Sequence, residues 1–399
     1  MDELNSFPQS CALNLDSNYC NQLDVECFSL MMKNPSYCYK FYWLEALVKI
    51  VDEDAVQVTF DAIINEMIAN AWYTVLEYHI HLSGMLKGEF RDSLELAVVE
   101  LAAKSGLSSN ASKVEIKNAI GQYHADIKKY KEALTKYVPY RALAGFYNRF
   151  EEGGGAKINW NNVSTIVEYT KTVNNRILLP YIFGENSQLN RTVIFNPLWK
   201  QYIQDNSVAF LGWIQYEKSK WLQINNPEVP GIVYKLFPTD ANTRKLKYVR
   251  ELWEIVLERE TVLERETVLD IYTNKPLDKS NYDIDHFIPW SFVMNDELWN
   301  LLPMEPSLNS SKNNRLPPWE FFKRFAQNQY EMYCLMWNDE FVRERFEKCY
   351  RDNIHSIWAE TELFKPGNSK ELFVDILKKN MQPVYDSAKR QGYEVWKFR

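Results

Sequence analysis

A single segment of the sequence gathers side chains that suit metal-assisted chemistry. Asp285 and His286 are adjacent, and the amides Asn300 and Asn309 follow in the same segment. Lys312 lies three residues beyond Asn309, so the two share a face if this stretch is helical. Histidine is a near-neutral base, and hard divalent ions prefer oxygen ligands such as carboxylates and amides. These residue types in this order predict a base and a metal ion acting on one reacting group.

The reaction that suits these side chains is hydrolysis of a phosphodiester bond. His286 would take a proton from the attacking water. Asp285 and the side-chain oxygen of Asn309 would hold a divalent ion that stabilises the leaving oxygen. Neighbouring residues on a strand point to opposite faces, so Asp285 and His286 can serve these different tasks. Asn300 could hydrogen-bond across the loop and hold the backbone at His286.

Three charged residues beside this set leave two interpretations open. Lys312 and Arg315 either contact substrate phosphate or are ordinary solvated charges. Asp283 either orients the site or faces solvent. We expect Lys312 to belong to the catalytic site and both cations to contact phosphate.

The stretch Tyr282–Arg315 resembles the HNH nucleases, a branch of the His-Me finger, or ββα-metal, superfamily. Its opening is similar to that of the HNH domain of RNA-guided CRISPR nucleases, and reads DIDHFIPWSF. The resemblance implies His286 as general base, Asp285 and Asn309 as ligands of Mg²⁺ or Mn²⁺, and Asn300 as the orienting residue. It covers about an eighth of the chain, at roughly residues 268–316.

The resemblance also implies a fold for this segment. A first strand is expected at 283–288, a second near 301–304 and a helix from about Ser307, with the turn 270–277 leading in. Asn309 takes a position that can also be His in this family. The CxxC zinc pairs that brace many HNH domains are absent, so surrounding helices must brace this one.

The rest of the chain predicts helices and few strands. Apolar residues recur at helical spacing, and turn-forming residues separate the periodic stretches. The expected helices cover residues 39–51, 60–72, 90–104, 113–136, 160–175, 196–225, 242–263, 319–350 and 370–389. The predicted fold is therefore mainly α with a small inserted ββα-metal element. We expect a helical scaffold at 1–240, the nuclease domain at 241–318 and a helical region at 319–399.

Composition limits the classes of protein that fit. The 399 residues are 46% hydrophobic and 15% aromatic, enough for a sizeable core. A net charge of -7 argues against a generic nucleic-acid coating protein. For a nuclease, it predicts weak, salt-sensitive binding to bare DNA and a partner that delivers the substrate.

Cysteine spacing and hydropathy indicate the compartment. None of the six cysteines forms a CxxC pair, so reduced cysteines are expected in place of a zinc site. The polar, acidic N-terminus does not look like a signal peptide, and apolar runs are too short to span a membrane. We expect a cytoplasmic protein without membrane contact. The six-residue repeat at 258–269 is expected to have no function.

These observations predict a metal-dependent endonuclease that cleaves DNA. The chain also resembles bacterial HNH endonuclease domain proteins, which implies defence against phages or mobile elements beside an ATPase or sensor. A homodimer would explain double-strand cuts. Two alternatives stay open: an RNA-cleaving toxin that uses the same site, and a non-catalytic nucleic-acid-binding or assembly protein with a relic HNH fold.

Overall fold

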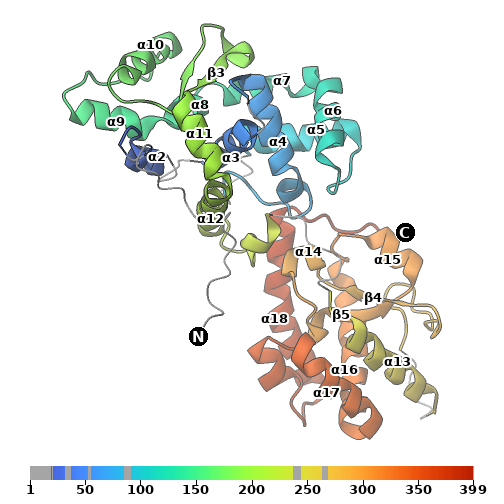
Figure 1. Cartoon of the computed structure of the whole chain (residues 1–399). Coiled ribbons are helices and arrows are strands. Elements are labelled where there is room, and N and C mark those ends of the chain that lie inside the picture. The colour runs from blue at the N-terminus through green and yellow to red at the C-terminus, as the bar shows by residue number, and fades with distance from the viewer. Residues whose placement is uncertain are drawn as a thin grey trace, which may run out of the picture. The chain divides into compact units, whose positions relative to one another are not determined.

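The computed structural model describes residues 19, 21–31, 37–52, 55–84, 91–236, 244–262 and 268–398. Cys11, Cys20 and the centre of the 258–269 repeat lie outside these residues. The fold is mainly α-helical with few short strands, as the sequence predicts (Figure 1). The chain divides into two compact units, Met1–Pro227 with Lys235–Phe237, and Glu228–Tyr234 with Pro238–Arg399. None of the described helices has the length and apolar content needed to cross a bilayer.

The N-terminal unit is a helical assembly that includes one small sheet (Figure 1). Its helices are α2 (Val25–Leu30), α3 (Tyr39–Asp52), α4 (Phe60–Leu76), α5 (Ser93–Ser105), α6 (Lys113–Gln122), α7 (His124–Leu134), α8 (Val138–Arg141), α9 (Ala144–Glu152), α10 (Val163–Asn174), α11 (Pro197–Asp205) and α12 (Ser207–Asn225). Its strands are β1 (Gln57–Thr59), β2 (Tyr181–Phe183) and β3 (Thr192–Phe195), and the 3-10 helix η2 (Gln188–Asn190) precedes β3.

The sheet of this unit was not expected from the sequence. Its order is β1-β3-β2, with both pairs antiparallel and Gln57 opposite Ile194. Each strand has only three or four residues, and β1 pairs with a strand far along the chain. Short strands with distant partners leave little local periodicity.

Capping side chains mark the starts of α4 and α6, but two helix breaks were missed. The Thr59 side chain caps α4, and Ser112 forms a capping box with Glu115 at the start of α6. The single helix expected at 113–136 is broken at Tyr123, and that at 196–225 is broken at Asn206. Apolar residues continue on both sides of each break, so hydrophobic periodicity alone does not reveal it.

The C-terminal unit contains the ββα segment and the helices around it (Figure 1). Its helices are α13 (Lys247–Val262), α14 (Trp290–Val293), α15 (Pro306–Lys312), α16 (Phe322–Asn338), α17 (Glu340–Asn353) and α18 (Lys370–Gln391). Its strands are β4 (Asp283–His286) and β5 (Leu301–Met304). Short turns complete it, namely the 3-10 helices η5 (Leu298–Asn300) and η6 (Trp319–Phe321) and the π-helical turn η7 (Ala359–Leu363). The 3-10 helix η3 (Ile232–Lys235) lies between α12 and α13 in sequence.

One hydrophobic core joins the ββα segment to the C-terminal helices, which we had expected as separate regions. Gln329 on α16 is fully buried and donates from Nε2 to the carbonyl of Leu301, at 2.6 Å. The C-terminal tail pairs with the chain after α15, where Leu316 forms a bridge with Val395. Helices and tail thus brace the segment, in the place of the zinc pairs that it lacks.

Candidate active site

The site is built on the hairpin of β4 and β5, followed by α15. The strands are antiparallel, with Asp285 opposite Leu302 and His286 opposite Leu301. The second strand has the bounds expected from the sequence, and the helix begins at Pro306, one residue before the expected start. Glu305 caps α15 by accepting the backbone N–H groups of Ser307 and Leu308.

A turn before β4 is tied to the start of α15. Asp270 is buried, and its Oδ1 accepts the backbone N–H groups of Tyr272 and Thr273. Its Oδ2 accepts the N–H of Glu305 at 3.3 Å. One carboxylate therefore links the lead-in turn to the helix that provides Asn309 and Lys312.

Side chains on β4 alternate between two environments. Asp283 and Asp285 are half-buried, whereas Ile284 and His286 are buried. Helix α15 contacts the face that bears the carboxylates: Asn309 Nδ2 donates to Asp283 Oδ2 at 3.1 Å. On the same face, Lys312 Nζ lies 2.8 Å from Asp285 Oδ2. The structure thus places Asp285, Asn309 and Lys312 at one β4–α15 contact, as the motif predicts.

His286 is paired with a carboxylate that the motif did not include. Its Nε2 lies 3.0 Å from Oδ1 of Asp296, and both side chains are buried, with 3% and 5% of their surface exposed. A carboxylate only accepts hydrogen bonds, so Nε2 of a neutral ring must hold the proton. The lone pair is then on Nδ1, the nitrogen left to act as a base.

Asp296 is held by two other parts of the C-terminal unit. Its Oδ2 accepts the backbone N–H of Lys245 at 2.5 Å. The buried side chain of Asn353, the last residue of α17, donates to the Asp296 carbonyl at 2.7 Å and to the Lys245 carbonyl at 2.9 Å. Asp296 was not among the candidate site residues of the sequence analysis. An acidic residue in the loop after His286 was its only local signal.

Asn300 clamps the chain just after His286, as expected for the orienting residue. It is fully buried, and its side chain both accepts from the N–H of Ile288 and donates to the Ile288 carbonyl, each at 2.8 Å. Its own carbonyl accepts the N–H of Phe287 at 2.8 Å. This three-bond clamp fixes the exit of β4 and therefore the position of the His286 backbone.

Lys312 and Arg315 lie differently from the phosphate contacts that we expected. Lys312 is 1% exposed, and its ammonium donates to the carbonyl of His286 at 2.8 Å while it pairs with Asp285. Its position is that of a buried brace between two site residues. Arg315 donates to the carbonyls of Ser311 and Lys312, which caps the end of α15.

Asp285 offers carboxylate oxygens, the kind of donor that a hard divalent ion prefers. Its Oδ2 is buried 2.8 Å from the Lys312 ammonium, which already neutralises part of its charge. Burial raises the pKa of the nearby Tyr272 well above its usual value, and the negative charge of Asp285 adds to this shift. No group of three or more His, Cys, Asp or Glu side chains suited to a metal occurs among the described residues. An ion here would therefore keep water or substrate oxygens as further ligands, as Mg²⁺ commonly does.

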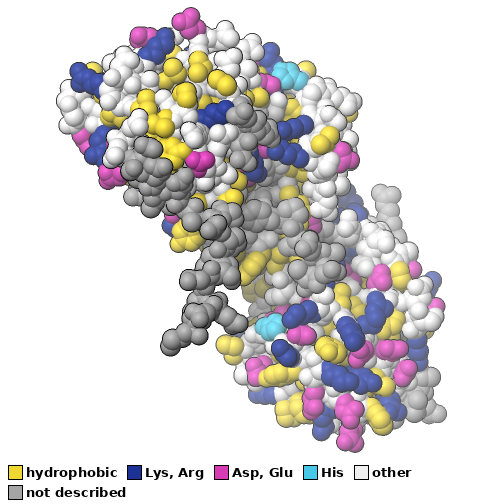
Figure 2. Space-filling model, viewed as in Figure 1, with side chains coloured by type: hydrophobic (Ala, Val, Ile, Leu, Met, Phe, Trp, Pro, Cys, Tyr) yellow, Lys and Arg dark blue, Asp and Glu magenta, His cyan; other side chains and the backbone are white. Residues whose placement is uncertain are grey.

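A cavity of about 350 Å³ is lined by Asp296, the partner of His286, with Lys245, Trp290 and Met294 among the other lining residues. Arg244 stacks on the Trp290 ring at 5.0 Å. Aromatic faces beside cations suit nucleotides. The visible face of the C-terminal unit does not show one continuous basic patch, because Lys and Arg alternate with Asp and Glu (Figure 2).

The comparison with known families agrees with this geometry. Residues 270–318 match the family described as HNH endonuclease. No curated protein matches the chain. The matched segment spans the lead-in turn, both strands, α15 and every residue discussed above from Asp270 to Arg315. These residues of the chain form an HNH endonuclease domain, which indicates nuclease activity.

Proposed function

We propose that this protein is a metal-dependent endonuclease that hydrolyses phosphodiester bonds in DNA, with His286 as general base. The observation that supports this most directly is the pairing of His286 Nε2 with Asp296 at 3.0 Å. It sets the tautomer in which Nδ1 can take a proton. The pairing occurs beside Asp285 on the strand that leads into the Asn300 clamp.

In the proposed mechanism, Nδ1 of His286 accepts the proton of the attacking water. Positive charge then develops on the ring, and the Asp296 carboxylate at Nε2 stabilises it. Asn300 keeps the ring in place through the backbone of Ile288. The contacts of Asp296 and Asn300 on which these steps depend are already formed.

Asp285 and the side-chain oxygen of Asn309 would hold the divalent ion, Mg²⁺ or Mn²⁺. When bound, such an ion supplies Lewis-acid stabilisation of the charge on the phosphate and leaving oxygen. Asn309 already uses its amide nitrogen on Asp283, which turns the amide oxygen away from that carboxylate. Lys312 neutralises part of the Asp285 charge, so it acts as a brace that limits repulsion among the acidic groups.

The burial of His286 indicates that access of the substrate to the base is regulated. Only 3% of its side chain is exposed, so a phosphodiester cannot reach the ring without movement of the residues around it. Cutting by the isolated protein should then be slow until substrate or a partner opens the site. A role in defence against phages or mobile elements, with an ATPase or sensor as that partner, rests on the sequence resemblance.

The test uses purified protein with Mg²⁺ or Mn²⁺ on plasmid, linear duplex, single-stranded DNA and RNA. We expect DNA cleavage that stops when metal is chelated and that is lost in His286→Ala. The matched control is His124→Ala, because His124 belongs to the N-terminal unit and lies outside the HNH segment.

The outcomes separate the alternatives. Equal cleavage by wild type and His286→Ala would refute the site. Cleavage of RNA alone would favour the toxin interpretation. A folded wild type that cuts none of the substrates would leave the relic interpretation or a missing activator, and repeating the assay with a candidate partner separates these two.

A further inference from the structure

A second candidate site lies within the N-terminal unit, in a cavity of about 470 Å³. We call it the basic pocket. Its walls come from α7 and the turn after it, from the start of α10, and from the chain that enters β3. The polar groups that matter below are Lys129, Lys136, Ser164, Ser187 and Arg191.

The basic pocket has more cations than its own acids neutralise. Lys129, Lys136 and Arg191 line it, and Glu132 is its only acidic lining residue. Glu132 lies 3.9 Å from Lys128, which is outside the pocket. In the part of the chain that the structure describes, no carboxylate pairs with any of the three lining cations. The pocket therefore has excess positive charge, although the whole chain has a net charge of -7.

Arg191 differs from the other two cations that line the basic pocket because its charge is buried. Only 6% of the residue is exposed. Its Nη1 donates to the carbonyl of Gly184 at 2.9 Å, and its Nε has no hydrogen-bond acceptor. A buried charge without a counter-ion is strongly unfavourable, so a bound anion would stabilise the protein at this position.

The start of α10 adds partial positive charge at the same cavity. Val163 and Ser164, in the first turn of this 12-residue helix, line the pocket. Asn162 caps the N–H groups of Ser164 and Thr165. The dipole of the helix still favours an anion at this end. The hydroxyl groups of Ser164 and Ser187 supply neutral donors, which suit the several oxygens of a phosphate group.

We propose that the basic pocket binds the phosphate group of a small phosphorylated ligand, of the size of a nucleotide. Its volume of about 470 Å³ is that of a small-molecule site. The cations, the helix start and the hydroxyl groups line one cavity, and the buried guanidinium of Arg191 gives the site a fixed charge. The proposal is independent of the nuclease site, because every residue involved belongs to the N-terminal unit.

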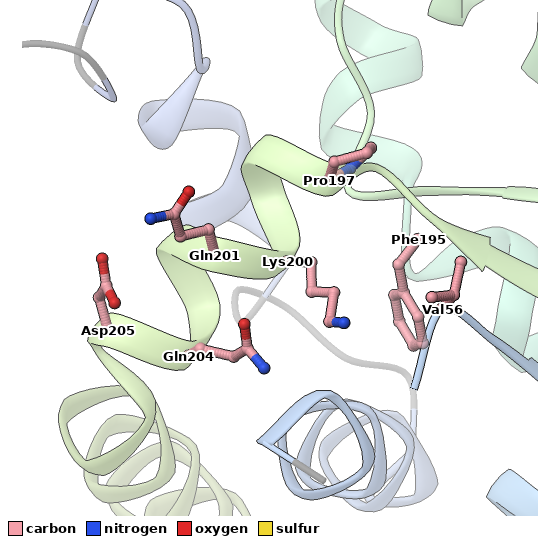
Figure 3. A pocket seen from close by; sticks show the side chains of 7 residues that line it. All are labelled: Val56, Phe195, Pro197, Lys200, Gln201, Gln204 and Asp205. Carbon is pink, nitrogen blue, oxygen red and sulfur yellow. The ribbon is translucent and has the colours of Figure 1, made fainter. Parts of the chain in front are cut away.

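Another cavity of the N-terminal unit serves as the reference with which the basic pocket is compared. Its volume is also about 470 Å³, and it is lined by one cation, Lys200, together with Asp205 and two glutamines (Figure 3). Lys200 extends from α11 toward Phe195 and Val56, as Figure 3 shows. One lysine with one carboxylate leaves no excess of charge, so Lys200→Ala is the matched control.

The experiment measures binding of pyrophosphate, AMP and ATP to the full chain by calorimetry, with a 5′-phosphorylated oligonucleotide as a separate titrant. We expect saturable binding of the small phosphates with one site per chain. Loss of a charged hydrogen-bond donor should weaken it by roughly tenfold or more in Arg191→Gln and in the double variant Lys129→Ala/Lys136→Ala. Lys200→Ala should bind as the wild type does.

The double variant Lys129→Ala/Lys136→Ala distinguishes a loss of phosphate binding from a loss of folding. Lys129 and Lys136 are exposed, so their loss should leave the circular dichroism spectrum unchanged even where Arg191→Gln destabilises the unit. Absence of saturable binding by folded wild type would overturn the proposal, and so would equal binding by wild type and the double variant. Binding of the oligonucleotide alone would overturn the small-ligand assignment and place a nucleic-acid strand in the pocket.

Discussion

At the scale of single residues, the pairing of His286 with Asp296 decides how the site can work. The two side chains are buried together, and neither has another acidic or basic side chain within ion-pair distance among the described residues. A base whose tautomer is set by one partner is sensitive to any change in that partner. The same contact could instead hold the ring in a resting position, and the two roles predict opposite effects of removing the carboxylate.

Asp296→Asn should lower the cleavage rate by about 100-fold or more, the usual worth of general-base catalysis. An amide can donate to Nε2, which would favour the tautomer with the proton on Nδ1 and remove the base. Nitrogen NMR of the His286 ring should show that shift of tautomer. Asp352→Asn is the control, because Asp352 lines the neighbouring cavity and pairs with Lys245 instead. Faster cleavage by Asp296→Asn would identify Asp296 as a latch.

Asn309→Ala should raise the Mg²⁺ concentration needed for half-maximal cleavage by roughly tenfold or more. Loss of a residue that only hydrogen-bonds to a metal ligand already weakens metal affinity by this factor. Among the described residues, the Asn309 side chain forms one hydrogen bond, to Asp283, so the stability of the protein should change little. Ser310→Ala, an exposed neighbour on α15, should leave the metal titration unchanged. An unaltered titration in Asn309→Ala would remove this residue from the metal site.

At the scale of elements, the sequence was most informative where spacing and chemistry agreed. The bounds of β5 and the start of α15 were predicted within a residue, because the resemblance to HNH nucleases implies a strand–turn–helix order for this polar motif. Asp296 was missed because its partner His286 is reached through a loop, and loop geometry leaves no periodic signal. The β1-β3-β2 sheet was missed for a related reason, since its pairing is distant in sequence.

The cap of α5 provides a test of stability against pH. Asp92 is buried, its Oδ1 accepts the N–H of Glu95 at 2.8 Å, and its Oδ2 has no partner. Burial raises the pKa of Asp92 to about 7 in the folded protein, above its ordinary value of 3.8. The folded state therefore binds more protons than the unfolded state between these values, and stability falls as pH rises through this window.

Asp92→Asn keeps the capping oxygen and removes the charge. At pH 8 the variant should be more stable than wild type by a few kcal/mol, on the order of the linkage free energy, and near pH 4 the two should be similar. Urea unfolding at both pH values measures the difference. Asp24→Asn is the control, because Asp24 caps α2 in the same way but is 27% exposed. A gain for Asp92→Asn that is the same at both pH values would contradict the assigned cause.

At the scale of the whole molecule, the negative net charge distinguishes this protein from a typical DNA-binding protein. The chain has 53 acidic against 46 basic residues, and its visible face mixes both signs (Figure 2). Attraction of the proposed DNA substrate then depends on a few cations near the site, such as Arg244, and is opposed by the rest of the surface. Such binding should be weak and strongly screened.

The affinity of His286→Ala for a labelled duplex should therefore fall by roughly tenfold or more between about 50 and 200 mM salt, because each neutralised phosphate releases counter-ions. This variant keeps the substrate intact during the measurement by fluorescence anisotropy. The dependence of the affinity on salt concentration should be the same for a duplex of unrelated sequence, since contacts to the phosphate backbone do not distinguish bases. Tight binding that is insensitive to salt would show that base contacts or a preformed groove dominate. The acidic surface would then have no part in limiting access to His286.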